Sequence, residues 1–159
     1  MTTTKIKRSA VLTYMWTNPP TNTVYSLIGD GVATAKIAMK PKTTEEQYIN
    51  EDSARVSVDS YAPSLPVEMT CKVGDPVFEY IDALRIARAI DEDAETYIFN
   101  VWNYKAGGPT AVPAEKQKVA IAIEDFGEAG GVPVKITYTI YFIGDPVTGT
   151  FNITTPAFT

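Results

Sequence analysis

The segment Gly74–Ile90, with the sequence GDPVFEYIDALRIARAI, clearly predicts a helix, over about residues 75–90. Asp75 suits the N-cap because its carboxylate can accept hydrogen bonds from the free N–H groups of the first turn. Pro76 follows at the first helical position, where a missing N–H costs nothing. One apolar stripe recurs at three- and four-residue spacing: Val77, Tyr80, Ile81, Leu84 and Ala87. Burial of each large apolar side chain stabilises by about 1.5–3 kcal/mol, so the helix is expected to pack on the rest of the chain.

Short strands separated by turns are predicted for almost all of the remaining chain. The expected strands are Val11–Trp16, Val24–Ile28, Val32–Met39, Arg55–Tyr61, Val67–Val73, Thr96–Tyr104, Lys116–Phe126, Val134–Ile143 and Gly149–Ile153. The tetrapeptide Gly144–Val147 (GDPV) is expected to be a turn between the last two. The pattern predicts a mainly β protein, a sandwich or barrel of about eight strands with one flanking helix.

Composition limits the classes of protein that fit this chain. Its 159 residues favour a single domain, 1–159, with a polar segment 1–10 that is expected to be flexible. No apolar run approaches the roughly 20 residues needed to span a bilayer, so no membrane partner is expected. The N-terminus has no long apolar core and predicts no signal peptide. The net charge is −5, there is no histidine, and Cys71 is the single cysteine, which leaves no disulfide and no cysteine metal cluster.

Residues that could carry out chemistry are scarce. There is no Gly-rich phosphate loop, no metal-ligand spacing and no nucleophile elbow. The carboxylate pairs Glu45-Glu46, Asp91-Glu92 and Glu124-Asp125 are expected to be solvated. The first two lie in predicted loops, and neighbours on a strand point to opposite faces. Lys5, Lys7 and Arg8 are the only basic cluster, too small for tight DNA binding. The sequence therefore predicts no catalytic residue, no metal site and no cofactor.

The polar segment Lys40–Ser53, KPKTTEEQYINEDS, predicts either a long loop or an extended hairpin arm. Long loops inside compact domains are uncommon and often functional. Within it, Tyr48 and Ile49 could contact another chain, or the tyrosine could pack back on its own domain. The candidate subunit-contact residues are Thr43, Thr44, Glu45, Glu46, Gln47, Tyr48, Ile49, Asn50 and Glu51.

Two longer stretches resemble a known family. They are YAPSLPVEMTCKVGDPVFEYIDALRIARAIDEDAETYIFNV, Tyr61–Val101, and AEKQKVAIAIEDFGEAGGVPVKITYTIYFIGDPVTGTFN, Ala114–Asn152. Both are similar to the tail tube, or major tail, proteins of long-tailed bacteriophages of Gram-positive bacteria, of the non-contractile kind. The features that carry the resemblance are the Tyr-x-Pro-Ser connector, the Asp-Pro-Val-Phe helix start, the Pro-Ala-Glu-Lys-Gln strand entry, the Asp-Phe-Gly-x-x-Gly-Gly turn and the Gly-Asp-Pro-x-x-Gly-Thr-Phe end. The resemblance covers roughly residues 14–159.

The resemblance implies a β-sandwich or barrel with a flanking helix, related to type VI secretion tube proteins. It implies a virion tail protein, assembled in the host cytoplasm, whose hexameric rings stack into a hollow tube. The implied partners are other copies of the chain, the tape-measure protein, and tail initiator and terminator proteins. DNA would pass through the lumen without specific binding. The segment Lys40–Ser53 corresponds to a long loop that this family uses to reach adjacent subunits.

A second hypothesis comes from a different class of protein. A small β-sandwich could bind a ligand such as a carbohydrate through exposed aromatic residues, here Trp102, Tyr104 and Tyr97. That reading requires the aromatic side chains to form one exposed platform. An enzyme is disfavoured by the absence of histidine and of any catalytic spacing.

Overall fold

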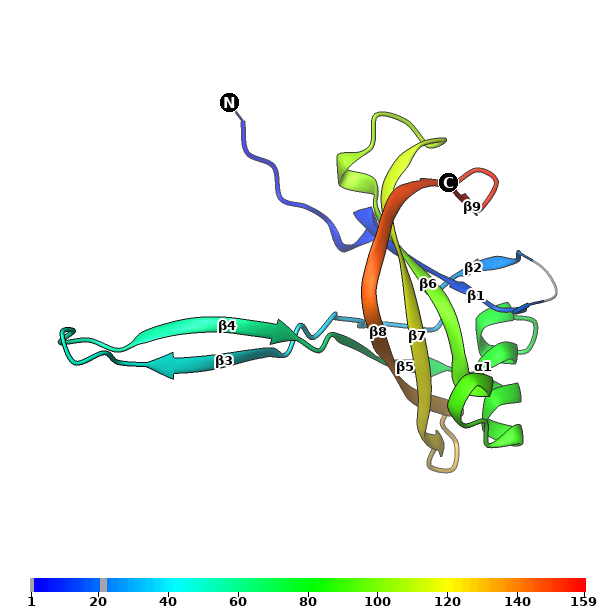
Figure 1. Ribbon diagram of the computed structural model, residues 1–159. Coiled ribbons are helices and arrows are strands. Elements are labelled where there is room, and N and C mark those ends of the chain that lie inside the picture. Colours follow the sequence, from blue (N-terminus) through cyan, green and yellow to red (C-terminus); the bar gives the residue numbers. More distant parts are fainter. Residues whose placement is uncertain (1, 21–22) are drawn as a thin grey trace.

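The computed structural model describes residues 2–20 and 23–159 and consists mainly of β-strands (Figure 1). The strands are β1 (Val11–Trp16), β2 (Tyr25–Leu27), β3 (Pro41–Glu46), β4 (Arg55–Tyr61), β5 (Ser64–Thr70), β6 (Glu95–Trp102), β7 (Val112–Gly127), β8 (Lys135–Asn152) and β9 (Ala157–Phe158). The helices are α1 (Pro76–Ala87) and the short 3-10 helices η1 (Arg8–Ala10), η2 (Asp91–Ala94) and η3 (Asn103–Lys105). The predicted class, mainly β with one flanking α-helix, is confirmed.

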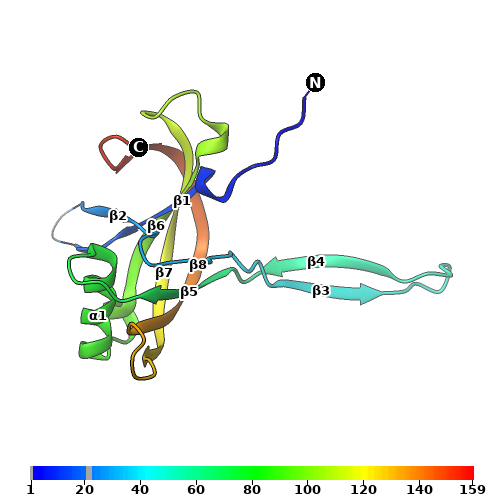
Figure 2. The ribbon, with the colours of Figure 1, turned by 180° about the vertical axis from the view of Figure 1, so that it is seen from behind.

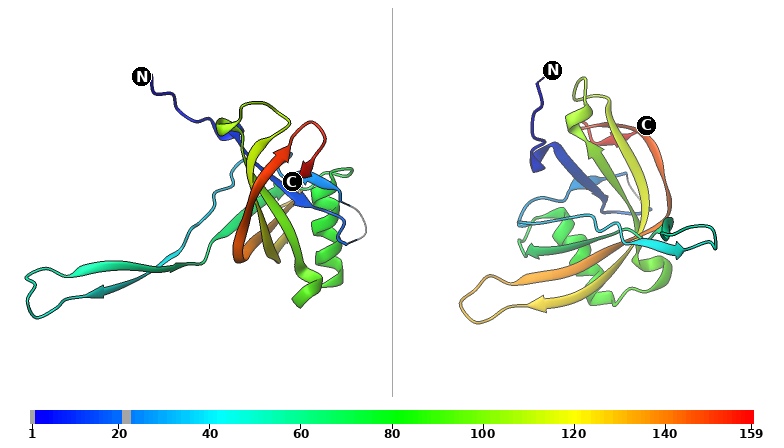
Figure 3. Two further views of the ribbon diagram at one scale, coloured as in Figure 1. Left: turned by 45° about the horizontal axis from the view of Figure 1, so that its top comes forward. Right: turned by 90° about the vertical axis from the view of Figure 1, so that its left-hand side faces the viewer.

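One antiparallel sheet forms the body of the molecule. Its strand order is β2-β1-β6-β7-β8-β5, and β9 pairs with the end of β8. The long strands β7 and β8 twist and curve, so that the sheet wraps into a nearly closed barrel (Figure 3). The outer edge of β5 meets residues 35–38, which form isolated bridges from Ala35 to Val67 and from Ala38 to Ser64. Residues 2–7, by contrast, are exposed and have no regular secondary structure.

Two apolar clusters pack on opposite faces of this sheet. The larger cluster lies under α1 and includes Ile98, Val119 and Tyr138. The smaller cluster is aromatic and includes Phe99, with Phe151 at a ring-centroid distance of 5.6 Å. Ile98 and Phe99 are neighbours on β6, and adjacent strand residues point to opposite faces. The body therefore buries apolar side chains on both sides of one sheet.

Helix α1 follows the predicted pattern at its start and departs from it at its end. The Asp75 carboxylate accepts from the Val77 N–H at 3.1 Å, and Val77, Ile81 and Leu84 are buried. The helix ends at Ala87 because Arg88 adopts the left-handed conformation, with φ of 49°. The expected end at Ile90 was wrong, and Ala87, assigned to the buried stripe, is exposed.

Two predictions about strands were also wrong. Residues 32–39 form no strand, because they touch β5 only through the two isolated bridges. The tetrapeptide Gly144–Val147 is not a turn. Strand β8 continues through it, and its pairing with β7 is irregular at this point. Lys116 pairs with Val147 and Lys118 with Ile143. The buried amide of Gln117 fills the gap, donating to the carbonyl of Ile143 at 2.8 Å and to that of Gly144.

Candidate functional site

Strands β3 and β4 leave the barrel as a two-stranded arm (Figures 1 and 2). Among the described residues they pair only with each other, from Pro41 opposite Tyr61 to Glu46 opposite Arg55, and every residue in both strands is exposed. Of the two predictions for this region, the hairpin arm is correct. Its extent is Pro41–Tyr61, longer than the predicted 40–53. The predicted strand Arg55–Tyr61 is confirmed as β4, and it belongs to the arm.

All nine candidate contact residues lie in this arm. Thr43, Thr44, Glu45 and Glu46 belong to β3, and Gln47, Tyr48, Ile49, Asn50 and Glu51 belong to the connection at the tip. The tip has its own hydrogen bonds: Gln47 Nε2 donates to the Glu51 carbonyl at 3.1 Å, and the Tyr48 hydroxyl donates to Glu46 Oε2 at 2.9 Å. These bonds within the arm give the tip a defined shape.

Apolar side chains on the arm face solvent. Ile49 is fully exposed, and Val56 and Val58 are 66% and 55% exposed. Tyr48 lies 5.4 Å from the Arg55 guanidinium, a contact within the arm. The alternative in which this tyrosine packs back on the body is therefore wrong. Exposed apolar side chains on so thin an element are typical of a surface that another chain covers.

The arm tip is strongly acidic. Between Thr43 and Ala54 there are four carboxylates, Glu45, Glu46, Glu51 and Asp52, and no basic residue, so the tip carries a formal charge of −4. Arg55 forms an ion pair with Glu51. Within the described part of the chain, the carboxylates of Glu45 and Asp52 have no hydrogen-bond or ion-pair partner. The tip thus combines unpaired negative charge with an exposed isoleucine.

Val56, Val58 and Tyr61 extend the candidate surface beyond the residues that the sequence indicated. Their alternation correctly predicted the strand Arg55–Tyr61, but the predicted arm ended at Ser53 and did not include that strand. The signal that could have identified them is the polar strand on the other side of the tip, PKTTEE, which offers no apolar partner to Val56 or Val58. A two-stranded hairpin is marginally stable by itself, so a partner surface would stabilise this arm.

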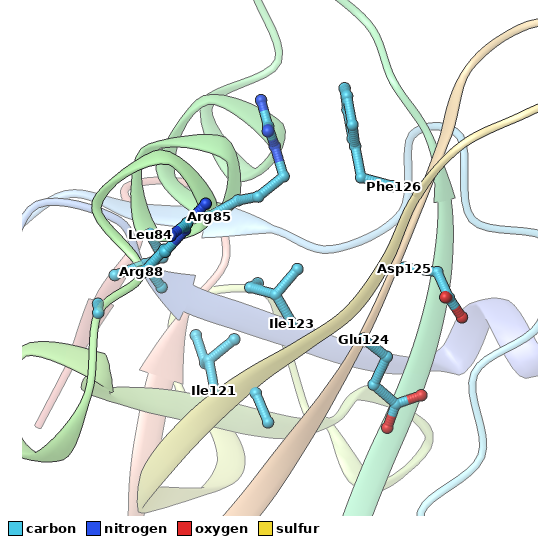
Figure 4. Close-up of a pocket in the computed structure, with 10 residues that line it drawn as sticks. Leu84, Arg85, Arg88, Ile121, Ile123, Glu124, Asp125 and Phe126 are labelled. Carbon is cyan, nitrogen blue, oxygen red and sulfur yellow. The ribbon is translucent and has the colours of Figure 1, made fainter.

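The carboxylate pairs provide no reactive site. Glu45 and Glu46 lie on β3, not in the expected loop, and Asp91 and Glu92 lie in η2. Glu124 and Asp125 sit at a bulge that turns both away from α1, not to opposite faces (Figure 4). Glu124 accepts a hydrogen bond from Thr139 at 2.7 Å. The described residues contain no group of acidic or cysteine side chains that could hold a metal ion, and no helix among them is long and apolar enough to cross a membrane.

The aromatic residues of the second hypothesis do not form one platform. Tyr97 and Trp102 are five positions apart on β6 and point to opposite faces. Tyr97 packs on Trp16 with ring centroids 6.0 Å apart, and Lys116 lies over its ring. Tyr104 is in η3, outside the strand. This arrangement argues against a flat sugar-binding surface.

Comparison with known proteins identifies the fold. No family model matches the sequence, and a search of curated proteins finds no match. Solved structures do match. The SPP1 tail tube aligns with a TM-score of 0.68 and 14% identity over 91% of this chain and 78% of that one. The tail of an empty GTA particle, determined with C6 symmetry, aligns with a TM-score of 0.65 and 9% identity over 90% and 98%.

A third structure, the baseplate of the anti-feeding prophage, aligns with a TM-score of 0.50 and 10% identity over 93% of this chain and 97% of that one. The chain therefore has the fold of phage tail tube proteins, as the resemblance of its sequence implied.

Proposed function

We propose that this chain is the structural subunit of a phage tail tube. Its copies assemble as stacked hexameric rings, and the hollow tube conducts the tape-measure protein and then DNA. The observation that carries the proposal is the match of nine-tenths of the chain to the SPP1 tail tube fold, together with an arm whose strands pair with no other strand of the described residues. The subunit works by assembly and has no active site.

The finer parts of the proposal have separate support. The C6 symmetry of the GTA tail supports rings of six. The resemblance of the sequence supports a virion tail, a non-contractile phage of Gram-positive bacteria, and contact with initiator and terminator proteins. A net charge of −5 supports passage of DNA without phosphate contacts, since tight binding needs clustered lysine and arginine.

Negative-stain electron microscopy of the concentrated protein after days of incubation tests this proposal. The full chain is expected to form hollow tubes or stacked rings of uniform diameter. Deletion of Thr43–Glu51 is expected to leave a folded monomer, with circular dichroism like that of the full chain, that makes no tubes. Normal tubes from this deletion would show that the arm is not required for assembly. A full chain that stays monomeric even with tail initiator complexes would contradict the tube itself.

A matched pair of substitutions separates the arm from exposed apolar residues in general. Ile49 at the arm tip and Val73 in the turn before α1 are both almost completely exposed. Ile49→Ser is expected to prevent tube formation, and Val73→Ser to leave it unchanged. Equal effects of the two substitutions would mean that loss of surface hydrophobicity, and not loss of the arm contact, blocks assembly.

A further inference from the structure

A groove of about 630 Å³ lies between the C-terminal half of α1 and strand β7 (Figure 4). Leu84 and Ala89 line it on the helix side, and Ile121 and Ile123 on the strand side. Leu84 and Ile121 are nearly buried and form an apolar floor. The volume is that of a site for several side chains or a small ligand.

The strand that lines this groove has an unpaired backbone edge. β6 pairs with β7 only as far as Glu95 opposite Ala120. From Ile121 to Gly127, β7 pairs with β8 on one side, and no strand of residues 2–20 or 23–159 pairs with its other side. Free N–H and C=O groups along a strand edge favour the addition of a strand from another chain.

A β-bulge determines which side chains face the groove. Ile123 pairs with Tyr138 and Asp125 with Thr137, so Glu124 is the extra residue. The bulge reverses the alternation, and therefore Phe126 shares the groove side with Ile123 while both carboxylates point away (Figure 4). Phe126 is 47% exposed and lies 3.9 Å from the Arg85 guanidinium.

Two arginines give the groove a basic rim. Arg85 is held by Asp82, with its guanidinium nitrogen 2.7 Å from a carboxylate oxygen. Arg88 is exposed, and its side chain has no hydrogen-bond or ion-pair partner within the described residues. Glu124 and Asp125 also line the groove, with their carboxylates pointing away from α1. On the helix side the groove thus offers an apolar floor, a free strand edge and one unpaired positive charge.

We infer that this groove receives the arm tip of a second copy of the chain. This inference rests on the proposed self-assembly and names the surface on which the arm docks. The tip offers the complementary groups: exposed Ile49 for the floor, the unpaired carboxylates of Glu45 and Asp52 for Arg88, and arm strands whose outer edges are unpaired. Each feature of the groove finds a counterpart on the tip.

The positions of the two surfaces require a second copy. The arm projects from one side of the barrel, and α1 lies on the other side (Figures 1 and 2, and the left view of Figure 3). An arm cannot reach the groove of its own chain. Contact between two different surfaces is head-to-tail, and repeated head-to-tail contact closes into rings or continues as a filament.

Charge distinguishes this groove from another large pocket, because Arg85 and Arg88 line the groove together with Glu124 and Asp125. A pocket of about 660 Å³ at the root of the arm is lined by Asp59, Glu115 and Asp145 and by no basic residue. Its carboxylates would repel a tip with a charge of −4. The α1–β7 groove is therefore the better match for the arm.

Disulfide trapping tests the contact directly, and it does so whether or not tubes form. In a Cys71→Ser background, chains with Ile49→Cys are mixed with chains that carry Phe126→Cys and lack Thr43–Glu51. Mild oxidation is expected to give a cross-linked heterodimer that high salt suppresses. Val147→Cys, on a β8 residue that is 59% exposed and lies away from the groove, is the matched control and is expected to give at least about tenfold less. Equal yields from both positions would overturn the inference.

Charge reversal provides the second test. Arg88→Glu is expected to raise the protein concentration needed for assembly about tenfold, as is Glu45→Lys with Asp52→Lys. The combination of all three is expected to restore assembly. If Arg88→Glu forms tubes normally and the cross-link between positions 49 and 126 does not form, this contact is wrong but the proposed function stands. The cross-link without any tubes would keep the contact and reject the tube.

Discussion

The barrel and the arm use the same sequence pattern in opposite ways. On β7, Val119, Ile121 and Ile123 alternate with small or polar residues and pack in the core under α1. On β4, Val56 and Val58 alternate in the same manner and face solvent. Alternation determines which side of a strand is apolar, and the fold determines whether anything covers that side. The arm is therefore a strand pair whose apolar side chains stay exposed.

The largest expected difference between the two regions concerns the free energy of unfolding. Phe99 is completely buried and packs against Tyr25, Phe151 and Phe158. Phe99→Ala is expected to destabilise the protein by about 3–5 kcal/mol through lost burial and a residual cavity. Ile49→Ala in the arm is expected to change stability by less than about 0.5 kcal/mol. Urea unfolding of both variants makes the measurement, and similar losses would mean that the arm packs on the body.

A smaller difference in stability is expected between two valines that both belong to alternating strands, one in the body and one in the arm. Val119→Thr places a hydroxyl at a completely buried position and is expected to cost about 1–3 kcal/mol, because the hydroxyl must lose its water. Val58→Thr adds the same hydroxyl on the exposed arm and is expected to cost less than about 0.5 kcal/mol. Thermal unfolding followed by circular dichroism measures both. A cost at Val58 equal to that at Val119 would show that the arm face is covered.

The body also contains a buried tyrosine that makes stability depend on alkaline pH. The Tyr138 hydroxyl has no hydrogen-bond partner among the described residues, and burial, with a smaller contribution from Asp75, raises its pKa. The unfolded tyrosine loses its proton near pH 10 and the folded one keeps it. The stability contribution is therefore complete below about pH 10 and falls above it, by up to about 1.4 kcal/mol per pH unit.

Tyr138→Phe is expected to flatten this decline and to leave stability at pH 7 equal or higher, because it removes the unpaired hydroxyl. Burial also raises the pKa of Tyr14, Tyr25 and Tyr80, so part of the slope will remain. Urea unfolding at pH 8 and pH 11 measures the change. An unaltered slope in Tyr138→Phe would assign the whole decline to the other tyrosines.

The smallest expected effect has opposite signs for folding and assembly. Arg88 is a non-glycine residue in the left-handed conformation, and glycine adopts it without strain. Arg88→Gly is expected to stabilise the monomer by about 0.5–1 kcal/mol and to weaken assembly by removing the guanidinium from the groove. Arg88→Ala is the matched control, which also loses the charge but keeps the backbone strain. Stronger assembly of Arg88→Gly would contradict a role for this arginine in the groove.

Much of the fold could be predicted from the sequence because its determinants are local. The cap at Asp75, Pro76 and the apolar spacing after them define the start and the buried face of α1. The run Thr96–Tyr104 indicated the strand β6. The wrong predictions occur where contacts between residues far apart in the sequence determine the local structure. Gly144–Val147 resembles a turn locally, but pairing with β7 and the Gln117 amide keep β8 continuous.

The candidate site likewise has features that the sequence determines and features that depend on the tertiary structure. The sequence by itself determined that residues 40–53 are polar and acidic and contain an apolar pair, Tyr48 and Ile49, because composition and spacing are local properties. Only the tertiary structure decided that Arg55–Tyr61 completes the arm, and that α1 and the free edge of β7 form a groove on the far side of the barrel. Burial and strand pairing depend on contacts between segments far apart in the chain, and no local pattern contains them.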